Sequence, residues 1–189
     1  MPADAEAHAL SALMDLQASR LRARVGPGGR VVPLAEQDRA RWDHLLVRRG
    51  LEGLRRAEEL GGARGAYALQ AAIAACHARA RSVDDTDWAR IAALYGALVQ
   101  ATGSPVAELN RAVAVGMALG PAQGLALVDA LAAEPSLRDY HLLPAVRGDL
   151  LARLGRTAEA GAEFARAADL CANPREREHL RARARDLAR

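Results

Sequence analysis

Lysine is missing from the sequence, so arginine supplies every basic side chain other than histidine. The 26 arginines are mixed with 23 acidic residues, and the net charge is +3. An arginine-only chain is typical of a GC-rich genome and does not itself indicate a function. Arginines are concentrated only at 181–189, where nucleic-acid contact is one interpretation and a solvated helix face is the favoured one. We therefore expect no direct DNA binding.

Aromatic residues are scarce, at 3% of the chain, although hydrophobic residues make up 51%. Alanine, leucine and valine must therefore fill the core. Alanine has the highest helix propensity, whereas strands favour β-branched and aromatic residues. The composition predicts an all-α protein.

Cysteine is limited to Cys76 and Cys171, which lie in separate apolar segments. A secreted fold built on disulfides needs more cysteines than this. Residues 1–10 carry acidic side chains and no basic flank, which does not match a signal peptide. No segment has the roughly 20 uncharged apolar residues that a membrane span requires. These absences favour a cytoplasmic protein without membrane contact.

Two helices are expected before residue 62. The first covers 4–24, and its apolar residues recur at helical spacing: Leu10, Leu13, Met14 and Leu16. The glycines and proline of 25–34 predict a loop, with a short β-hairpin as the alternative. The second helix covers 36–60, with Asp38 as its N-cap and Gly61 and Gly62 at its end. Its expected apolar stripe is Leu45, Leu46, Leu51 and Leu54.

Helical segments and short turns alternate from residue 65 onward. The predicted segments are 65–80, 88–100, 105–119, 121–134, 141–154, 157–171 and 174–187. The turns between them contain Gly, Pro, Ser, Asp or Asn, which favour chain reversal.

The later helix pairs repeat. A shift of 36 residues places small residues on small ones and large on large: Ala112 on Gly148, Val115 on Leu151, Gly124 on Ala160, Val128 on Phe164 and Leu131 on Ala167. An earlier pair, 65–101, fits less well, with Ala75 at the small position. Such a repeat predicts stacked antiparallel helices. We expect one compact domain, in which the N-terminal helices of 1–62 pack on repeats at 63–189 with a C-terminal capping helix.

Residues 145–170 match the tetratricopeptide repeat (TPR) pattern best. The matching positions are Gly148, Leu151, Gly155, Ala160, Phe164 and Ala167. Small residues let two helices approach, and Phe164 fills the space between them. The other two units are degenerate, so we describe the repeats as TPR-like.

The adjacent Cys76 and His77 raise the question of a thiol nucleophile or a metal site. Neighbours on a helix point about 100° apart, so the two side chains do not converge. Cys76 is expected to pack as a small apolar residue, and His77 to face a groove or solvent.

No other segment predicts chemistry. The acidic run 83–87 lacks the glycine and closing glutamate of a calcium loop and is better explained by capping of the helix at Trp88. The glycines near residue 28 do not follow a phosphate-loop pattern. Trp42 and Trp88 are expected to anchor packing. We therefore predict no enzyme activity, no metal site and no cofactor.

Several phrases of the chain resemble the TPR-like C-terminal extension of a group of extracytoplasmic-function (ECF) sigma factors of bacterial RNA polymerase. They are LVRRGLEGLRRA (46–57), ALQAAIAACHARA (68–80), DTDWARIAALYGAL (85–98), SPVAELNRAVAVGMALGPAQGLALVDAL (104–131) and YHLLPAVRGDLLARLGRTAEA (140–160). GRVVPLAEQDRARWD (29–43) resembles the segment just after the promoter-reading region. The phrases occur in order over nearly the whole chain.

The resemblance implies a regulatory, protein-interaction domain that controls sigma-dependent transcription. The domains that bind polymerase and read the promoter are not recognisable here, which favours an excised tail domain over a natural stand-alone protein. The implied partners are the sigma core domains and RNA polymerase, and a DGPF-containing, YCII-related protein is a further expected partner.

Stacked helix hairpins offer a groove lined by the first helix of each pair. The polar residues expected there are Gln70, His77, Asn110, Arg111, Tyr140, His141 and Arg147. Structural alternatives are a loop carbonyl as partner of Asn110, and an ion pair of Arg147 with Asp149 or Asp139. The rival functions are a stand-alone TPR-like scaffold and a small-molecule sensor, with a pocket near Tyr67, His77 and Tyr140.

Overall fold

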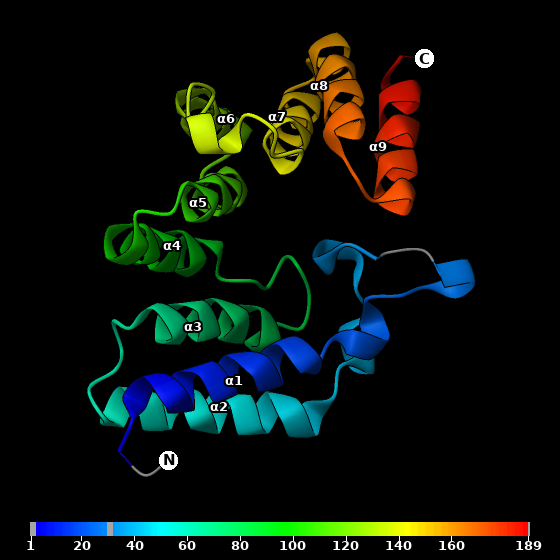
Figure 1. The fold of residues 1–189 in the computed structure, drawn as a ribbon. Coiled ribbons are helices and arrows are strands. Elements are labelled where there is room, and N and C mark those ends of the chain that lie inside the picture. Colours follow the sequence, from blue (N-terminus) through cyan, green and yellow to red (C-terminus); the bar gives the residue numbers. More distant parts are fainter. Residues whose placement is uncertain (1–2, 30–31, 189) are drawn as a thin grey trace. The chain divides into compact units, whose positions relative to one another are not determined.

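A computed structural model describes residues 3–29 and 32–188 of the chain (Figure 1). The described residues form helices and turns without a β-sheet, which confirms the all-α prediction. The α-helices are α1 (Ala5–Ala18), α2 (His44–Glu59), α3 (Ala66–Arg79), α4 (Trp88–Thr102), α5 (Pro105–Ala118), α6 (Pro121–Ala130), α7 (Leu142–Arg153), α8 (Thr157–Leu170) and α9 (Pro174–Leu187). Backbone contacts divide the chain into two compact units, unit 1 up to Gly103 and unit 2 from Ser104.

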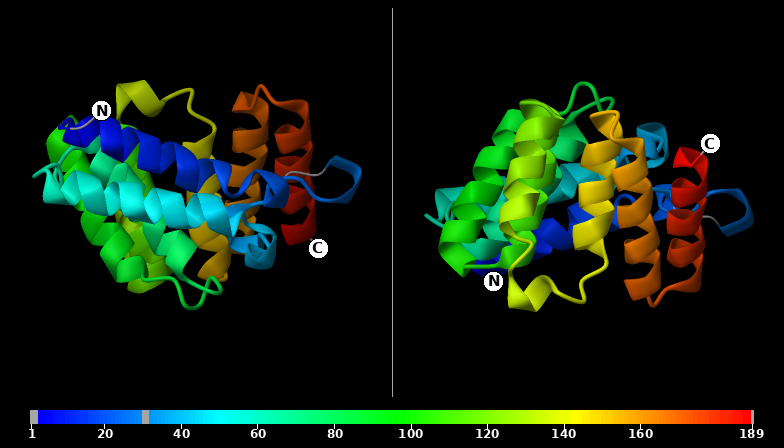
Figure 2. Two further views of the ribbon diagram at one scale, coloured as in Figure 1. Left: turned by 90° about the horizontal axis from the view of Figure 1, so that it is seen from below. Right: turned by 90° about the horizontal axis from the view of Figure 1, so that it is seen from above.

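Unit 1 is built on α1, which packs against both α2 and α3, while α4 packs on α3 (Figures 1 and 2). The approach of α1 and α2 depends on glycine. A Cβ atom at Gly50 would lie 2.6 Å from Cγ of Leu16, and one at Gly53 would lie 3.2 Å from Cβ of Ala12. Alanines therefore form much of the buried face of α1, where Ala9 and Ala12 are completely buried beside Leu16.

Three residues of the predicted apolar stripes of α1 and α2 are exposed in the structure. Leu10, Met14 and Leu45 were expected to face the core, but their exposed fractions are 36%, 63% and 58%. Leu16 and Leu54 of the predicted stripes are buried, and Gly50 leaves the space that Leu16 fills, whereas the three exposed residues face outward. The buried residues of α2 are Val47, Gly50, Leu54 and Ala57.

The predicted start of α2 was also wrong. Asp38 caps only a 3₁₀ turn at Arg39–Arg41. The carboxylate of Asp43 accepts hydrogen bonds from the backbone N–H groups of Leu45 and Leu46, which makes Asp43 the N-cap of α2. Trp42 is extended and buried between the two caps, so one continuous helix cannot form across it.

The loop predicted at 25–34 contains a 3₁₀ turn at Pro27–Gly29. The backbone N–H of Val32 donates to the carbonyl of Arg24 at 2.9 Å, so the chain doubles back over this segment. The hairpin alternative also involved residues 30 and 31, which lie outside the described residues.

Unit 2 has the predicted order of helix hairpins. Helices α5 and α6 pair, α7 and α8 pair, and α9 packs on α8 (Figure 2). Adding 36 to the first residue of α6, Pro121, gives Thr157, the first residue of α8, so the repeat found in the sequence coincides with the helices. The fold is a stack of helix hairpins closed by α9.

Small residues set the helix spacing within each hairpin. A Cβ atom at Gly124 would lie 2.8 Å from both the carbonyl oxygen of Ala112 and Cα of Gly116. In the next hairpin, Gly148 faces Ala160 and the ring of Phe164. Phe164 has an exposed fraction of 2% and belongs to the core of unit 2. The structure confirms the prediction that small residues let the paired helices approach and that Phe164 fills the space between them.

The boundary between the units differs from the predicted division at 62/63. Helix α3 shares a core with α1 and α2 through Ala68, Ala71 and Ala75, so the first helix of the expected repeats belongs to unit 1. Within the described residues, no helix is long and apolar enough to cross a membrane.

Candidate interaction groove

An apolar groove crosses the first helix of each hairpin in unit 2 and reaches α9. Its volume is about 220 Å³. Its lining comes from α5, α7, α8 and α9: Val113, Met117, Ala145, Val146, Asp149, Leu150, Arg153, Phe164, Leu180 and Arg183. The hairpin stack thus places an apolar surface where a TPR-like domain presents its concave face.

Charged side chains border this groove, and most are already held by neighbours. Arg153 donates to the carbonyl of Gly116 at 3.0 Å and contacts the sulfur of Met117 at 3.3 Å. Arg183 pairs with Asp149 at 3.0 Å and lies over the ring of Phe164, 4.3 Å from its centre. These contacts link α5 to α7 and α7 to α9, so they fix the shape of the groove.

Asn110 and Arg111 lie on different faces of α5. Asn110 is three residues before Val113 and seven before Met117, which puts it on the groove side. Its side chain is exposed, so the amide can be hydrated. Arg111 is occupied by a two-point pair with Glu108, at 2.6 and 2.8 Å.

Arg147 lies outside this groove, in a second cleft of about 320 Å³ between α6, α7 and α8. It pairs with Asp129 at 2.8 Å and with Glu163 at 2.9 Å. The alternative considered from sequence, a pair with Asp149 or Asp139, is replaced by these two pairs, and Asp149 is instead bound by Arg183. Arg147 therefore holds three helices together.

Tyr140 and His141 lie at the start of α7, and their ring centres are 6.0 Å apart. The Nε2 atom of His141 is 3.2 Å from a carboxylate oxygen of Glu176 in the first turn of α9. Tyr140 and His141 thus lie at the N-terminal end of α7. They are not among the residues that line the groove.

In unit 1, His77 is a structural residue. Its backbone carbonyl accepts a hydrogen bond from Arg39, whose guanidinium also donates to the carbonyl of Ala80 and the hydroxyl of Thr86. The imidazole ring of His77 packs edge-on against the ring of Trp88, with 5.3 Å between the ring centres. Burial, helped by the charges of Arg39 and Arg20, lowers the pKa of His77 to about 4. The imidazole is therefore neutral at physiological pH.

Cys76 and Gln70, on the same helix, are also accounted for by local structure. Burial raises the pKa of the Cys76 thiol, which keeps it protonated and a poor nucleophile. The packing role predicted for Cys76 agrees with its exposed fraction of 6%. The side-chain amide of Gln70 donates to the carbonyl of Ala66 within α3.

The two tryptophans are packing anchors, as predicted. Trp42 is buried, and Arg20 and Arg39 lie over its ring at 5.8 and 5.4 Å. The indole N–H of Trp88 donates to the carbonyl of Val83. Asp87, in the acidic run, accepts from the N–H of Arg90 and caps α4.

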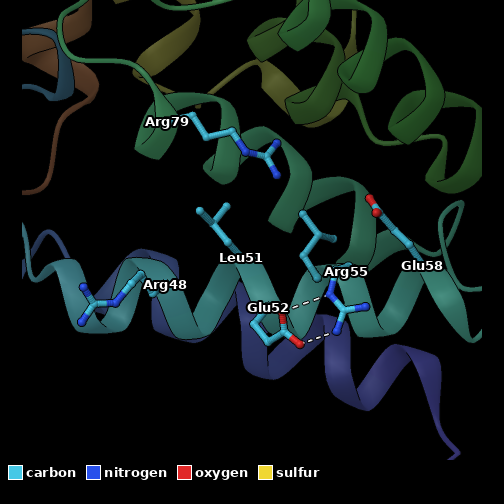
Figure 3. Close-up of a pocket in the computed structure, with 7 residues that line it drawn as sticks. Arg48, Leu51, Glu52, Arg55, Glu58 and Arg79 are labelled. Carbon is cyan, nitrogen blue, oxygen red and sulfur yellow. Dashed lines mark hydrogen bonds and ion pairs between the residues drawn. The ribbon is translucent and has the colours of Figure 1, made fainter.

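Unit 1 contains a charged cleft that sequence reasoning missed (Figure 3). It lies between α2 and α3 and has a volume of about 350 Å³. Arg48, Glu52, Arg55 and Glu58 come from α2, and Arg79 comes from α3. Arg55 is bound by Glu52 and Glu59. The cleft is lined by side chains of both charges. In the sequence, these residues look like the ordinary solvated face of a helix, so no pattern indicates a cleft.

Two residues of the sensor pocket considered from sequence, Tyr67 and His77, do not come together on α3. Tyr67 and His77 are ten residues apart on α3, which separates them by about 15 Å along the helix. Tyr67 is exposed and His77 is packed against Trp88.

Comparison with known proteins gives a partial match to a family. A family of unknown function, DUF6596, matches residues 1–58, which include α1 and most of α2. An uncharacterized protein of Rhizobium meliloti (strain 1021) is 42% identical over 187 residues, or 99% of this chain. The chain spans 44% of the length of that relative. No solved structure matches.

Proposed function

We propose that this chain is the regulatory C-terminal domain of an ECF sigma factor and acts by docking rather than by catalysis. The observation that carries the proposal is the apolar groove of unit 2, formed on the first helices of repeated hairpins. The ordered sequence resemblance to sigma-factor extensions supports the same role. The chain also spans less than half of its relative, which leaves room there for further domains.

The shape of the groove favours a protein segment over a small molecule. Pockets for drug-sized ligands usually measure roughly 300–1,000 Å³ and enclose the ligand. The groove measures about 220 Å³, has an apolar floor, and carries paired charges at its border. Such a surface suits one face of an amphipathic helix or an extended segment. The proposed occupant is a segment of the sigma core domains, with RNA polymerase and a DGPF-containing, YCII-related protein as further partners.

In vitro transcription would test this role with three proteins: the full-length factor, the factor without this chain, and the latter with this chain added back. We expect deletion to change promoter output and add-back to restore it. Equal output from all three would refute the regulatory role.

Groove variants locate the docking surface. Met117→Glu and Val113→Glu place a charge on the apolar floor and are expected to abolish the effect of add-back. Met14→Glu is the matched control, because Met14 is an exposed methionine of unit 1. Circular dichroism would confirm that each variant is folded. Normal add-back by folded Met117→Glu would exclude the groove as the docking site.

A further inference from the structure

The geometry points to a zinc site formed by His141, Cys171 and Glu176 at the end of the helix stack in unit 2. One ligand atom from each residue lies within 4.8 Å of the other two. The three residues come from the start of α7, the end of α8 and the first turn of α9. The inference does not depend on the proposed function.

The spacing of these atoms suits a tetrahedral ion. Zinc binds sulfur at about 2.3 Å and nitrogen or oxygen at about 2.0–2.2 Å, so its tetrahedral ligands lie roughly 3.3–3.7 Å apart. Nε2 of His141 and Oε1 of Glu176 are 3.2 Å apart. The remaining separations, at most 4.8 Å, need to close by up to about 1–1.5 Å, which side-chain rotation can provide.

Local hydrogen bonds hold the backbone at Cys171 and Glu176 in place. The carbonyl of Cys171 accepts from Arg177 at 2.9 Å. The side chain of Asn173 accepts from the N–H groups of Arg175 and Glu176, which fixes the first turn of α9. The backbone at these two ligands is therefore already ordered without an ion.

Burial and ligand chemistry agree with a transition-metal site. Cys171 has an exposed fraction of 1%, whereas the side chains of His141 and Glu176 are exposed by 23% and 39%. The thiol thus lies on the inner side and the other two ligands lie toward solvent. A thiolate with an imidazole selects zinc over magnesium or calcium. Three protein ligands leave a fourth position for water.

The ion would tie α9 to α7 and α8. Binding requires loss of the thiol proton from Cys171 and a neutral imidazole at His141. Because the unfolded chain does not gather the three ligands, zinc would stabilise the folded state by mass action. Zinc binding would therefore stabilise the packing of α9, the C-terminal capping helix, on the rest of unit 2.

The test uses the untagged chain, stripped of metal and kept reduced with a phosphine. Co²⁺ is the spectroscopic probe, and Zn²⁺ is then added in competition. We expect one Co²⁺ per chain, a thiolate-to-cobalt charge-transfer band, and displacement by Zn²⁺. Zinc at a hundredfold excess over its dissociation constant should raise the melting temperature by about 5–10 °C.

Matched variants assign the ligands. His141→Ala, Glu176→Gln and Cys171→Ser should each lose the band or weaken binding at least tenfold. His179→Ala, Glu178→Gln and Cys76→Ser are the controls and should bind normally. His141 and Glu176 are partly exposed, so their variants test the site even if Cys171→Ser fails to fold. Absence of the thiolate band, or unchanged binding by folded His141→Ala, would overturn the proposal.

Discussion

Each unit holds one cysteine, but the two cysteines have different surroundings. In unit 1, Cys76 and His77 are adjacent in sequence, yet the thiol is buried and the imidazole is packed on Trp88. In unit 2, His141, Cys171 and Glu176 are up to 35 residues apart in sequence, yet their ligand atoms converge within 4.8 Å. Adjacency along a helix separates side chains, whereas the ends of packed helices bring distant ones together.

The units also differ in how their cores are filled. Unit 1 depends on alanine faces and on arginine bonds to its loops, while unit 2 repeats one hairpin pattern around a single phenylalanine. The difference predicts which substitutions are most damaging in each unit.

Phe164→Ala is expected to have the largest effect. The ring is almost fully buried, faces Gly148 and is covered by Arg183. Removal of a buried phenylalanine ring destabilises by about 3–5 kcal/mol through lost transfer energy and a cavity. Denaturant unfolding would measure it, with Phe164→Leu as the control that keeps much of the volume. A loss below about 1 kcal/mol would show that unit 2 does not depend on this residue.

Much of this core could be predicted from sequence. The 36-residue repeat gave the hairpins of unit 2 and placed Phe164 between helices, because small and large residues recur at fixed helical positions. The apolar stripes of α1 and α2 were right for Leu16 and Leu54 and wrong for Leu10, Met14 and Leu45, because the close contact of the two helices is made by alanine, glycine and Leu16. Amphipathic periodicity shows which face is apolar but not how near the next helix lies.

The site residues were less predictable. Asn110 and Arg147 were both predicted in the groove because each lies on the first helix of a hairpin. Asn110 lies on the groove side, whereas Arg147 lies in the second cleft, where its partners Asp129 and Glu163 come from helices whose orientation only the packing determines. In the cluster of His141, Cys171 and Glu176, the histidine precedes the cysteine by 30 residues, so no short motif could indicate it.

His77 gives unit 1 an expected dependence on pH. Its folded pKa is about 4, below the usual value of 6.5, so between these values the unfolded chain binds a proton that the folded chain does not. Its contribution is complete above about pH 6.5 and is lost as the pH falls toward 4, by roughly 2–3 kcal/mol.

Urea unfolding at neutral pH and near pH 4.5 would measure this loss. His77→Phe keeps an aromatic ring against Trp88 and has no proton to bind, so it should show a smaller loss of stability on acidification. The same acid sensitivity in His77→Phe and in the unchanged protein would contradict the assignment to His77.

Arg39→Ala tests the arginine contacts of unit 1. The substitution removes the donor to the carbonyls of His77 and Ala80 and to the hydroxyl of Thr86. Hydrogen bonds to charged groups contribute about 1.5–3 kcal/mol, and part of this is regained from water at a half-buried site. We expect a loss of about 2 kcal/mol in chemical unfolding. Arg48→Ala, at an exposed position of α2, should change stability by less than about 0.5 kcal/mol.

Gly161→Ala is expected to have the smallest effect and the opposite sign. Gly161 lies inside α8, and a Cβ atom there would be 3.6 Å from its nearest neighbour, the carbonyl oxygen of Ala184. Alanine is favoured over glycine inside a helix by about 0.5–1 kcal/mol, so thermal unfolding should move upward by roughly 1–4 °C. Gly124→Ala is the matched contrast, because its Cβ atom would meet backbone at 2.8 Å. That overpacking should destabilise by about 1–3 kcal/mol. Equal effects of the two substitutions would mean that the close approach of α5 and α6 does not require glycine at position 124.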